Sequence, residues 1–291
     1  MRRALRPGRQ SGRERALPNL IVIGAQKCGT TSLHNYLEAH PEISMSRRKE
    51  TNFFLEDGNW DRGLDWYASH FDPAAPVRGE TSTGYTNLPA SAGTADRMRS
   101  VVPGARLIYL VRDPLDRMAS SYVHRRATGA ERRSLAEALS DPRSPYVTQS
   151  CYATQLRPFL EHFSREQILI ETGERLLRER RATLGRIFEF VGVDSSFTSP
   201  EFERMWERTE GKAGLYSLAW PVAQRTQRRG IFLPRFLRWP AQRVLRLRLG
   251  GRGTERPVFD DQLRERMRER LSGEVHELRT LTGVELEGWD A

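Results

Sequence analysis

The chain lacks several features that would place a protein in a well-defined class. It has two cysteines, Cys28 and Cys151, in 291 residues, which is too few for a disulfide framework. The six histidines are scattered, and no Cys/His cluster has the spacing of metal ligands, so we expect no bound metal. No apolar run reaches the roughly eighteen residues that a membrane-spanning helix needs.

The N-terminal segment also lacks the marks of an export signal. Residues 1–17 are basic, and no apolar stretch follows that is long enough for the core of a secretory signal. We therefore predict a disordered lead-in over 1–17 and one folded domain over 18–291. With no export signal and few cysteines, a reducing, cytoplasmic location is expected.

Positive charge is in excess. The net charge is +10 and the isoelectric point is about 10.2, which favours an anionic partner. A phosphorylated nucleotide, a sulfated glycan, an anionic lipid or a nucleic acid would all be attracted, so composition alone leaves the partner open. Because no helix-turn-helix, RNA-recognition or zinc pattern is found, we expect no nucleic-acid partner.

Short apolar runs alternate with stretches of helical periodicity. Strands are predicted over residues 18–24, 77–80, 106–111 and 167–171, and helices over 30–40, 114–128, 150–163, 174–191 and 260–281. This alternation predicts an α/β fold, a single domain with a central mostly parallel sheet flanked by helices.

The first strand leads into a P-loop-like strand–loop–helix segment. Gly24 and Gly29 let the backbone wrap closely around phosphate oxygens, and the free amides of the helix start attract anions. Lys27 adds a positive charge within the loop. Three hydroxyl side chains crowd the start of the helix: Thr30, Thr31 and Ser32. The segment therefore predicts a site for a phosphorylated ligand.

This loop differs from the Walker A loop of ATPases. In that motif the lysine directly follows the second glycine, whereas here Thr30 stands at that position. No clear strand-end aspartate of the Walker B kind is found either. An ordinary ATPase is thus disfavoured, and an atypical P-loop nucleotide kinase, which would need Mg²⁺ and ATP, is the alternative enzyme class.

Four ordered segments resemble those of sulfotransferases that use 3'-phosphoadenylyl sulfate (PAPS), in particular the glycan-type branch that includes the heparan sulfate enzymes. The segments are IVIGAQKCGTTSLHNYLEAHP (21–41), KETNFF with GLDWYASHF (49–54 and 63–71), GETSTGY (79–85) and LIYLVRDPLDRMASSY (107–122). The resemblance implies transfer of a sulfuryl group from PAPS, without a metal, to a hydroxyl or amine of a carbohydrate or small-molecule acceptor.

The resemblance also implies roles for single residues. Glu50 matches the general base that removes the acceptor proton, and Lys27 would stabilise the leaving phosphate. Arg112 and Ser120 would hold the 3'-phosphate, and the predicted closing loop, residues 250–257, would add Arg252 and Gly253. The nucleotide-binding set is completed by Lys27, Cys28, Gly29, Thr30, Thr31 and Ser32.

Two positions depart from the pattern of the relatives. Glu80 is followed by Thr81, where heparan-type relatives often carry a lysine, so Glu80 becomes a secondary candidate for the base. Asn52 stands where some relatives carry a histidine, which would alter contacts with the acceptor.

A basic, aromatic stretch precedes the last predicted helix. Residues 211–254 contain no acidic residue. They contain Lys212 and nine arginines, which are interleaved with aromatic side chains. We expect residues 211–257 to form a lid or the acceptor-side wall, with peripheral contact to a membrane surface or a merely solvated basic face as alternatives. The identity of the acceptor and the oligomeric state are not predicted.

Overall fold

The computed structural model describes residues 15–204, 256–286 and 288–289. The chain groups into two compact units, each of which is described by itself. The first comprises Met1–Asp113, Cys151–Trp206 and Leu271–Ala291, and the second Pro114–Ser150 and Glu207–Arg270. Of the predicted lead-in, residues 1–14 lie outside the described part, whereas Ala16 and Leu17 pack against the core.

The first unit is built on a five-stranded sheet whose described pairings are all parallel. The spatial order is β2-β3-β1-β4-β5. The strands are β1 (Leu20–Gly24), β2 (Ile43–Met45), β3 (Val77–Thr81), β4 (Arg106–Val111) and β5 (Ile168–Thr172). The predicted α/β fold with a parallel central sheet is confirmed. β2 was not predicted, because a strand of three residues leaves almost no periodic signal.

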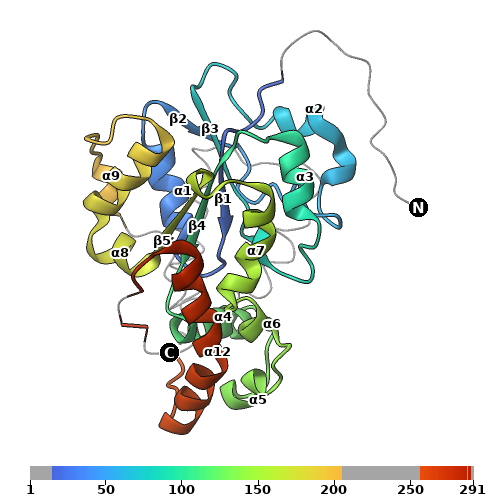
Figure 1. Ribbon diagram of the computed structural model, residues 1–291, viewed down its shortest axis with the longest axis vertical. Coiled ribbons are helices and arrows are strands. Elements are labelled where there is room, and N and C mark those ends of the chain that lie inside the picture. Colours follow the sequence, from blue (N-terminus) through green and yellow to red (C-terminus); the bar gives the residue numbers. More distant parts are fainter. Residues whose placement is uncertain (1–14, 205–255, 287, 290–291) are drawn as a thin grey trace, which may run out of the picture. The chain divides into compact units, whose positions relative to one another are not determined.

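Helices cover both faces of this sheet, with α1, α8 and α9 on one side and α3 and α7 on the other (Figure 1). The helices of the first unit are α1 (Thr30–Glu38), α2 (Gly63–Ala68), α3 (Thr94–Val101), α7 (Tyr152–His162), α8 (Gly173–Arg178) and α9 (Arg180–Val191). Short 3₁₀ helices cover Trp60–Arg62, Thr83–Thr86, Arg165–Gln167 and Pro200–Glu203. None of the helices in the described ranges is both long and apolar enough to cross a membrane.

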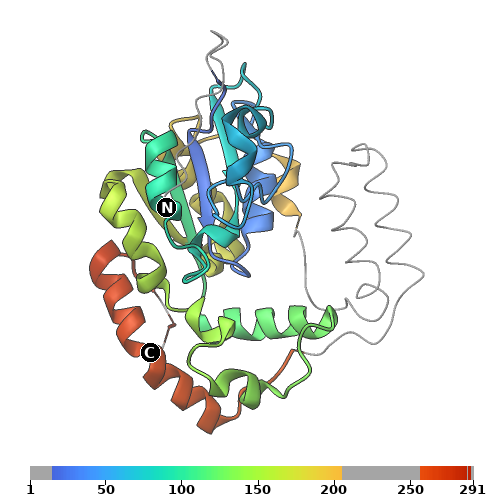
Figure 2. The same cartoon turned by 90° about the vertical axis from the view of Figure 1, so that its right-hand side faces the viewer.

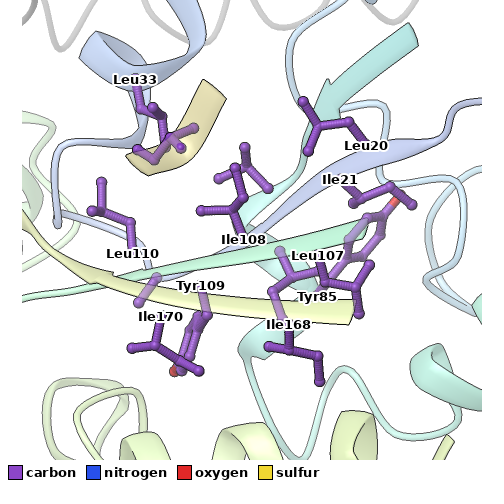
Figure 3. Close-up of a cluster of buried hydrophobic side chains, with 14 of the residues drawn as sticks. Leu20, Ile21, Leu33, Tyr85, Leu107, Ile108, Tyr109, Leu110, Ile168 and Ile170 are labelled. Carbon is purple, nitrogen blue, oxygen red and sulfur yellow. The ribbon is translucent and has the colours of Figure 1, made fainter. Parts of the chain in front are cut away.

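The core lies on both faces of the sheet, which explains why the strands read as continuous apolar runs. All five residues of β1 are buried. Along β4, Ile108 and Leu110 point to the same side as Leu33 of α1, whereas Tyr109 points to the opposite side with Ile170 (Figure 3). Burial of each such aliphatic side chain stabilises the fold by roughly 1.5–3 kcal/mol.

The second unit contains α4 (Pro114–Ala127), α5 (Leu135–Ser140), α6 (Pro145–Thr148) and the first part of α12 (Asp261–Thr282). α6 packs against both α4 and α5 (Figure 2). Arg117 of α4 is fully buried, and its guanidinium group donates to Ser150 Oγ at 2.6 Å and to the carbonyl of Tyr146. A buried cation supplied with these acceptors fixes the α6 segment against α4.

Candidate active site

The predicted strand–loop–helix segment forms between β1 and α1, and its loop is the predicted phosphate-binding loop. Gly29 occupies the N-cap position of α1 with φ 98°, a left-handed conformation that glycine adopts without strain. Gly29 has no side chain that could cap this helix end, and the first amides of a helix are suited to bind an anionic ligand. Lys27 sits in the loop at φ 72° and is half-buried.

Gly24 is required by close packing at the end of β1. A Cβ atom placed on it would lie 2.0 Å from Oγ1 of Thr86, far inside van der Waals contact. That threonine hydroxyl donates to the carbonyl of Ile23 at 3.1 Å, which holds the 3₁₀ helix Thr83–Thr86 over the strand end. The absence of a side chain at Gly24 therefore lets the 3₁₀ helix Thr83–Thr86 pack directly against the start of the loop.

Arg112 directly follows β4, which is the strand next to β1. It therefore lies at the same end of the parallel strands as the loop that follows β1. The amide of Ala25 donates to the carbonyl of Leu110 at 2.6 Å, which joins the start of the loop to the end of β4. The hydroxyl of Tyr152 donates to the carbonyl of Arg112 at 2.7 Å and lies 3.6 Å from Sγ of Cys28. The loop after β1 and Arg112, which are predicted to bind opposite ends of one nucleotide, therefore both lie at the carboxyl ends of the parallel strands.

The side chain of Arg112 has an acidic neighbour. Nε of Arg112 lies 4.0 Å from Oε1 of Glu174, the second residue of α8. The same carboxylate oxygen accepts a hydrogen bond from the amide of Asp113 at 3.0 Å. Burial raises the pKa of Glu174, and the backbone amide and Arg112 act in the opposite direction. Sequence reasoning missed this residue, because its closeness to Arg112 arises from the pairing of β4 with β5.

Glu50 lies on the other side of β1, at the end of β3. Its amide donates to the carbonyl of Thr81 at 2.8 Å. Its carboxylate accepts from the amide of Thr83 at 2.8 Å and from Nζ of Lys49 at 2.8 Å, and its side chain is 33% exposed. The carboxylate is therefore held in place and still reachable from solvent.

The backbone around Glu50 is strained. Glu50 has φ 61° and Asn52 has φ 49°, left-handed conformations that cost of order 1–3 kcal/mol each in a residue other than glycine. Such strain persists only where neighbouring contacts hold it, and it concentrates at functional sites. The amide of Asn52 is held by Ser82 Oγ at 3.0 Å.

His34 is a site residue that the sequence did not single out. Its Nδ1 lies 3.1 Å from Oγ1 of Thr81. Burial and, after it, the charge of Lys49 lower the pKa of His34 to about 3. The imidazole is therefore neutral at physiological pH. Its spacing, four residues after Thr30 on the same helix face, was the one available signal.

Glu80 is enclosed behind Glu50. It is 0% exposed, and its Oε2 accepts a hydrogen bond from Thr51 at 2.5 Å. Burial raises its pKa to about 7, although the hydroxyls of Thr51, Tyr85 and Tyr67 act in the opposite direction. Glu80 is the secondary candidate for the general base. Because its side chain is fully buried, an acceptor could not contact it.

The remaining predicted residues belong to the second unit or lie outside the described part. Ser120 lies on α4 and is half-buried. Arg252 and Gly253 of the predicted closing loop are outside the described residues, as is nearly all of the predicted lid. Arg256 is described and pairs with Asp116, one helical turn before Ser120. In the described ranges no group of three or more His, Cys, Asp or Glu side chains is placed to hold a metal ion.

Comparison with known protein families shows to which family this chain belongs. Residues 17–212 match the family model of the sulfotransferase domain. The chain belongs to the sulfotransferase family. The match spans the phosphate loop, Glu50 and Arg112, so the predicted family resemblance is confirmed.

Individual relatives of this sulfotransferase domain include glycan-modifying enzymes. The chain is 32% identical over 199 residues, 61% of its length, to the bifunctional heparan sulfate N-deacetylase/N-sulfotransferase 3 of Homo sapiens, of which it covers 22%. It is 39% identical over 116 residues to a membrane-associated sulfotransferase of Dictyostelium discoideum, covering 38% of this chain and 24% of that protein. The chain thus spans less than a quarter of the length of these two relatives.

A solved structure shares the fold. A sulfotransferase from Alicyclobacillus acidocaldarius superposes with a TM-score of 0.69 at 24% identity, over 95% of this chain and 100% of that one. The sheet and the strand–loop–helix described above are thus those of a sulfotransferase fold.

Proposed function

We propose that the protein transfers a sulfuryl group from PAPS to a hydroxyl or amine of a glycan or small-molecule acceptor. The observation that carries this proposal is the arrangement along one sheet edge. The loop bearing Lys27 follows β1, Glu50 lies at the end of the neighbouring β3, and Arg112 follows β4 on the opposite side. A cationic loop between a partly exposed carboxylate and an arginine suits a doubly phosphorylated donor next to an acceptor.

The residues present fit the donor. The uncapped amides at the start of α1 and the ammonium group of Lys27 would bind the 5'-phosphosulfate. Arg112 would bind the 3'-phosphate, where it would exchange its 4.0 Å contact with Glu174 for a shorter, charge-assisted one. Ser120 is proposed for the same phosphate. Closure of residues 250–257 over the nucleotide stays a proposal.

Glu50 is the proposed general base, and Lys27 is the residue proposed to stabilise the leaving phosphate. PAPS supplies the sulfuryl group and leaves as the 3',5'-bisphosphate. Glu50, fixed by the amide of Thr83, would take the proton of the acceptor as the new bond forms. Lys27 would stabilise the negative charge that grows on the leaving phosphate. His34, neutral and next to Thr81, would contact the acceptor or sulfuryl group without adding charge.

The class of acceptor follows from the relatives and from charge. The human relative is named for N-sulfation of heparan sulfate, and the net charge of +10 suits an anionic polysaccharide. We therefore place an aminoglycan first among acceptors and small hydroxylated metabolites second. A lid role or a membrane contact for residues 211–257 stays a prediction.

The test is transfer of radioactive sulfate from ³⁵S-labelled PAPS. The full chain is incubated with N-desulfated heparin, other glycans, lipids and small metabolites, with EDTA and without. Labelled acceptor in both conditions is expected. The Glu50→Gln protein serves as a matched control against contaminating activity. A protein that binds neither PAPS nor its bisphosphate product, but phosphorylates an acceptor with Mg²⁺ and ATP, would instead be the atypical kinase.

A further inference from the structure

A buried carboxyl group lies directly behind the loop that carries the proposed general base. We call this loop, residues 49–54, the base loop. Glu80 at the end of β3 is 0% exposed. The groups that face it are hydroxyls from three elements: Thr51 of the base loop, Tyr67 of α2 and Tyr85 of the 3₁₀ helix Thr83–Thr86. No lysine or arginine is among the main influences on its ionisation, and the described residues form no ion pair with it. An ionised Glu80 therefore has no directly paired cation.

Thr51 joins this carboxyl group to the proposed base. Its hydroxyl donates to Oε2 of Glu80 at 2.5 Å. Thr51 directly follows Glu50, whose left-handed φ of 61° would relax if the loop were free to move. A bond that fixes Thr51 therefore also fixes the backbone from which the Glu50 side chain projects.

Aromatic packing keeps the facing hydroxyls in place. The ring of Tyr67 stacks on Phe53 of the base loop with centroids 4.1 Å apart. The ring of Tyr85 lies 5.7 Å from that of Phe54, whose amide donates to the Tyr85 hydroxyl at 3.4 Å. The base loop and the surroundings of Glu80 thus form one packed unit.

We propose that Glu80 is a positioning residue for sulfuryl transfer: through Thr51 it holds the base loop, and it holds this loop most firmly when it is ionised, because a carboxylate is the stronger hydrogen-bond acceptor. This inference rests on the proposed function of Glu50. It explains why a carboxyl group is buried at a place where an amide would satisfy the same hydrogen bond.

The charge of Glu80 changes near neutral pH. Burial raises its pKa to about 7, and the negative charge of Glu50 adds to that rise. Oε1 of Glu80 has no hydrogen-bond partner among the described residues, and neither has the hydroxyl of Tyr67. The neutral form can place its proton on that oxygen, which makes no hydrogen bond with the described residues.

The positioning half is tested with Thr51→Val, which keeps the branched shape and removes the hydroxyl. Turnover with PAPS and N-desulfated heparin should fall at least ~10-fold at every pH, with the affinity for adenosine 3',5'-bisphosphate within about twofold of wild type. Thr183→Val is the matched control, since Thr183 is equally buried but lies on α9, away from the base loop. Turnover of the Thr51 variant within twofold of wild type would overturn the positioning role.

The charge half is tested with Glu80→Gln, which can still accept from Thr51. The variant should match wild type near pH 6, where Glu80 carries its proton, and fall about threefold or more behind it near pH 8. A constant ratio of the two rates across this range would overturn the charge role. Loss of turnover at both pH values, as in Thr51→Val, would leave only the positioning role.

A readout that needs no turnover separates this inference from the proposed function. If wild type neither binds the bisphosphate nor transfers sulfate to any acceptor, the proposed function fails. Amide hydrogen exchange of residues 50–55 then decides on the anchoring of the loop. Exchange at least ~10-fold faster in Thr51→Val than in wild type is expected, and equal exchange would remove Glu80 as the anchor.

Discussion

The hydroxyl of Tyr152 donates to the carbonyl of Arg112 at 2.7 Å. The same hydroxyl lies 3.6 Å from Sγ of Cys28 in the phosphate-binding loop. Gly173 lies on the same junction, since a Cβ atom on it would stand 2.7 Å from the carbonyl oxygen of Cys28. One tyrosine of α7 therefore ties together the two segments proposed to hold opposite ends of the donor.

Removing this hydroxyl tests the link. Tyr152→Phe should lower the free energy of unfolding by about 1 kcal/mol, because the partly buried carbonyl of Arg112 loses this donor. It should also weaken binding of adenosine 3',5'-bisphosphate several-fold, which calorimetric titration would measure. Tyr122→Phe is the matched control, because its hydroxyl donates to the carbonyl of Arg133 at 2.8 Å. If both variants lost stability and neither lost affinity, Tyr152 would be a purely structural residue.

Lys27 is expected to act in binding and in transfer. Lys27→Ala should weaken bisphosphate binding about 10-fold or more and lower kcat/KM by roughly 10²–10³, because the leaving phosphate loses its nearest cation. Alanine and lysine both carry a Cβ, so the strain of the φ of 72° is the same in both proteins. Lys27→Arg restores the charge and should recover part of the affinity. Wild-type kinetics in the alanine variant would take Lys27 out of the mechanism.

Glu50 is expected to act in transfer alone. Glu50→Gln can still accept from the amide of Thr83, so bisphosphate affinity should stay within about twofold while kcat falls by roughly 10²–10⁴. Glu56→Gln is the control in the same region, because that side chain is 81% exposed and 3.9 Å from its nearest cation, Arg97. Single-turnover measurements with excess enzyme would locate the defect in the chemical step. A glutamine variant that turns over normally would reassign the base.

How far the sequence predicts this site depends on whether its parts are local in the chain. The strand–loop–helix segment that carries Lys27 is predicted because strand, glycines, lysine and helix start follow one another within residues 20–32. The position of Arg112 directly after a strand is predicted for the same reason, since the strand before it has a clear apolar pattern.

The parts that the sequence did not reveal depend on contacts between distant segments. The burial of Glu80 depends on Thr51, Tyr67 and Tyr85 closing around it, and its own flanking residues give no sign of this. His34 became part of the site through Thr81, which lies 47 positions away. No periodic pattern carries such information, whereas the packing of β3 beside β1 creates it.

The close approach at the end of β1 gives a test of loop geometry. Gly24→Ala should lower stability by roughly 1–3 kcal/mol, because the new Cβ would overlap Oγ1 of Thr86. Gly24→Ala combined with Thr86→Ala removes the overlapping atom and should restore part of the loss. Denaturant unfolding of the four proteins in a double-mutant cycle measures the coupling. Gly104→Ala, where a Cβ would meet no atom within 4 Å, is the control. Additive losses in the cycle would show that this contact is not the reason for the glycine.

The raised pKa of Glu80 predicts how stability should depend on pH. With a pKa of about 7 in the folded protein and 4.5 as the ordinary value, the folded state holds a proton that the unfolded state has released between these pH values. The stability of the wild-type protein attributable to Glu80 therefore falls as pH rises from about 4.5 to 7.

Glu80→Gln removes this loss because an amide does not ionise. The variant should become more stable relative to wild type over the same pH range, by at most about 3 kcal/mol, while it loses activity near pH 8. Glu131→Gln should behave in the opposite way. Hydrogen bonds from the side chain and the backbone amide of Arg133 hold the pKa of Glu131 at about 2, so the ionised form of Glu131 stabilises the fold above pH 4.5. Chemical unfolding at several pH values measures both curves. Parallel curves for wild type and Glu80→Gln would mean that Glu80 keeps one charge state throughout, and that the energetic cost of its burial is met in some other way.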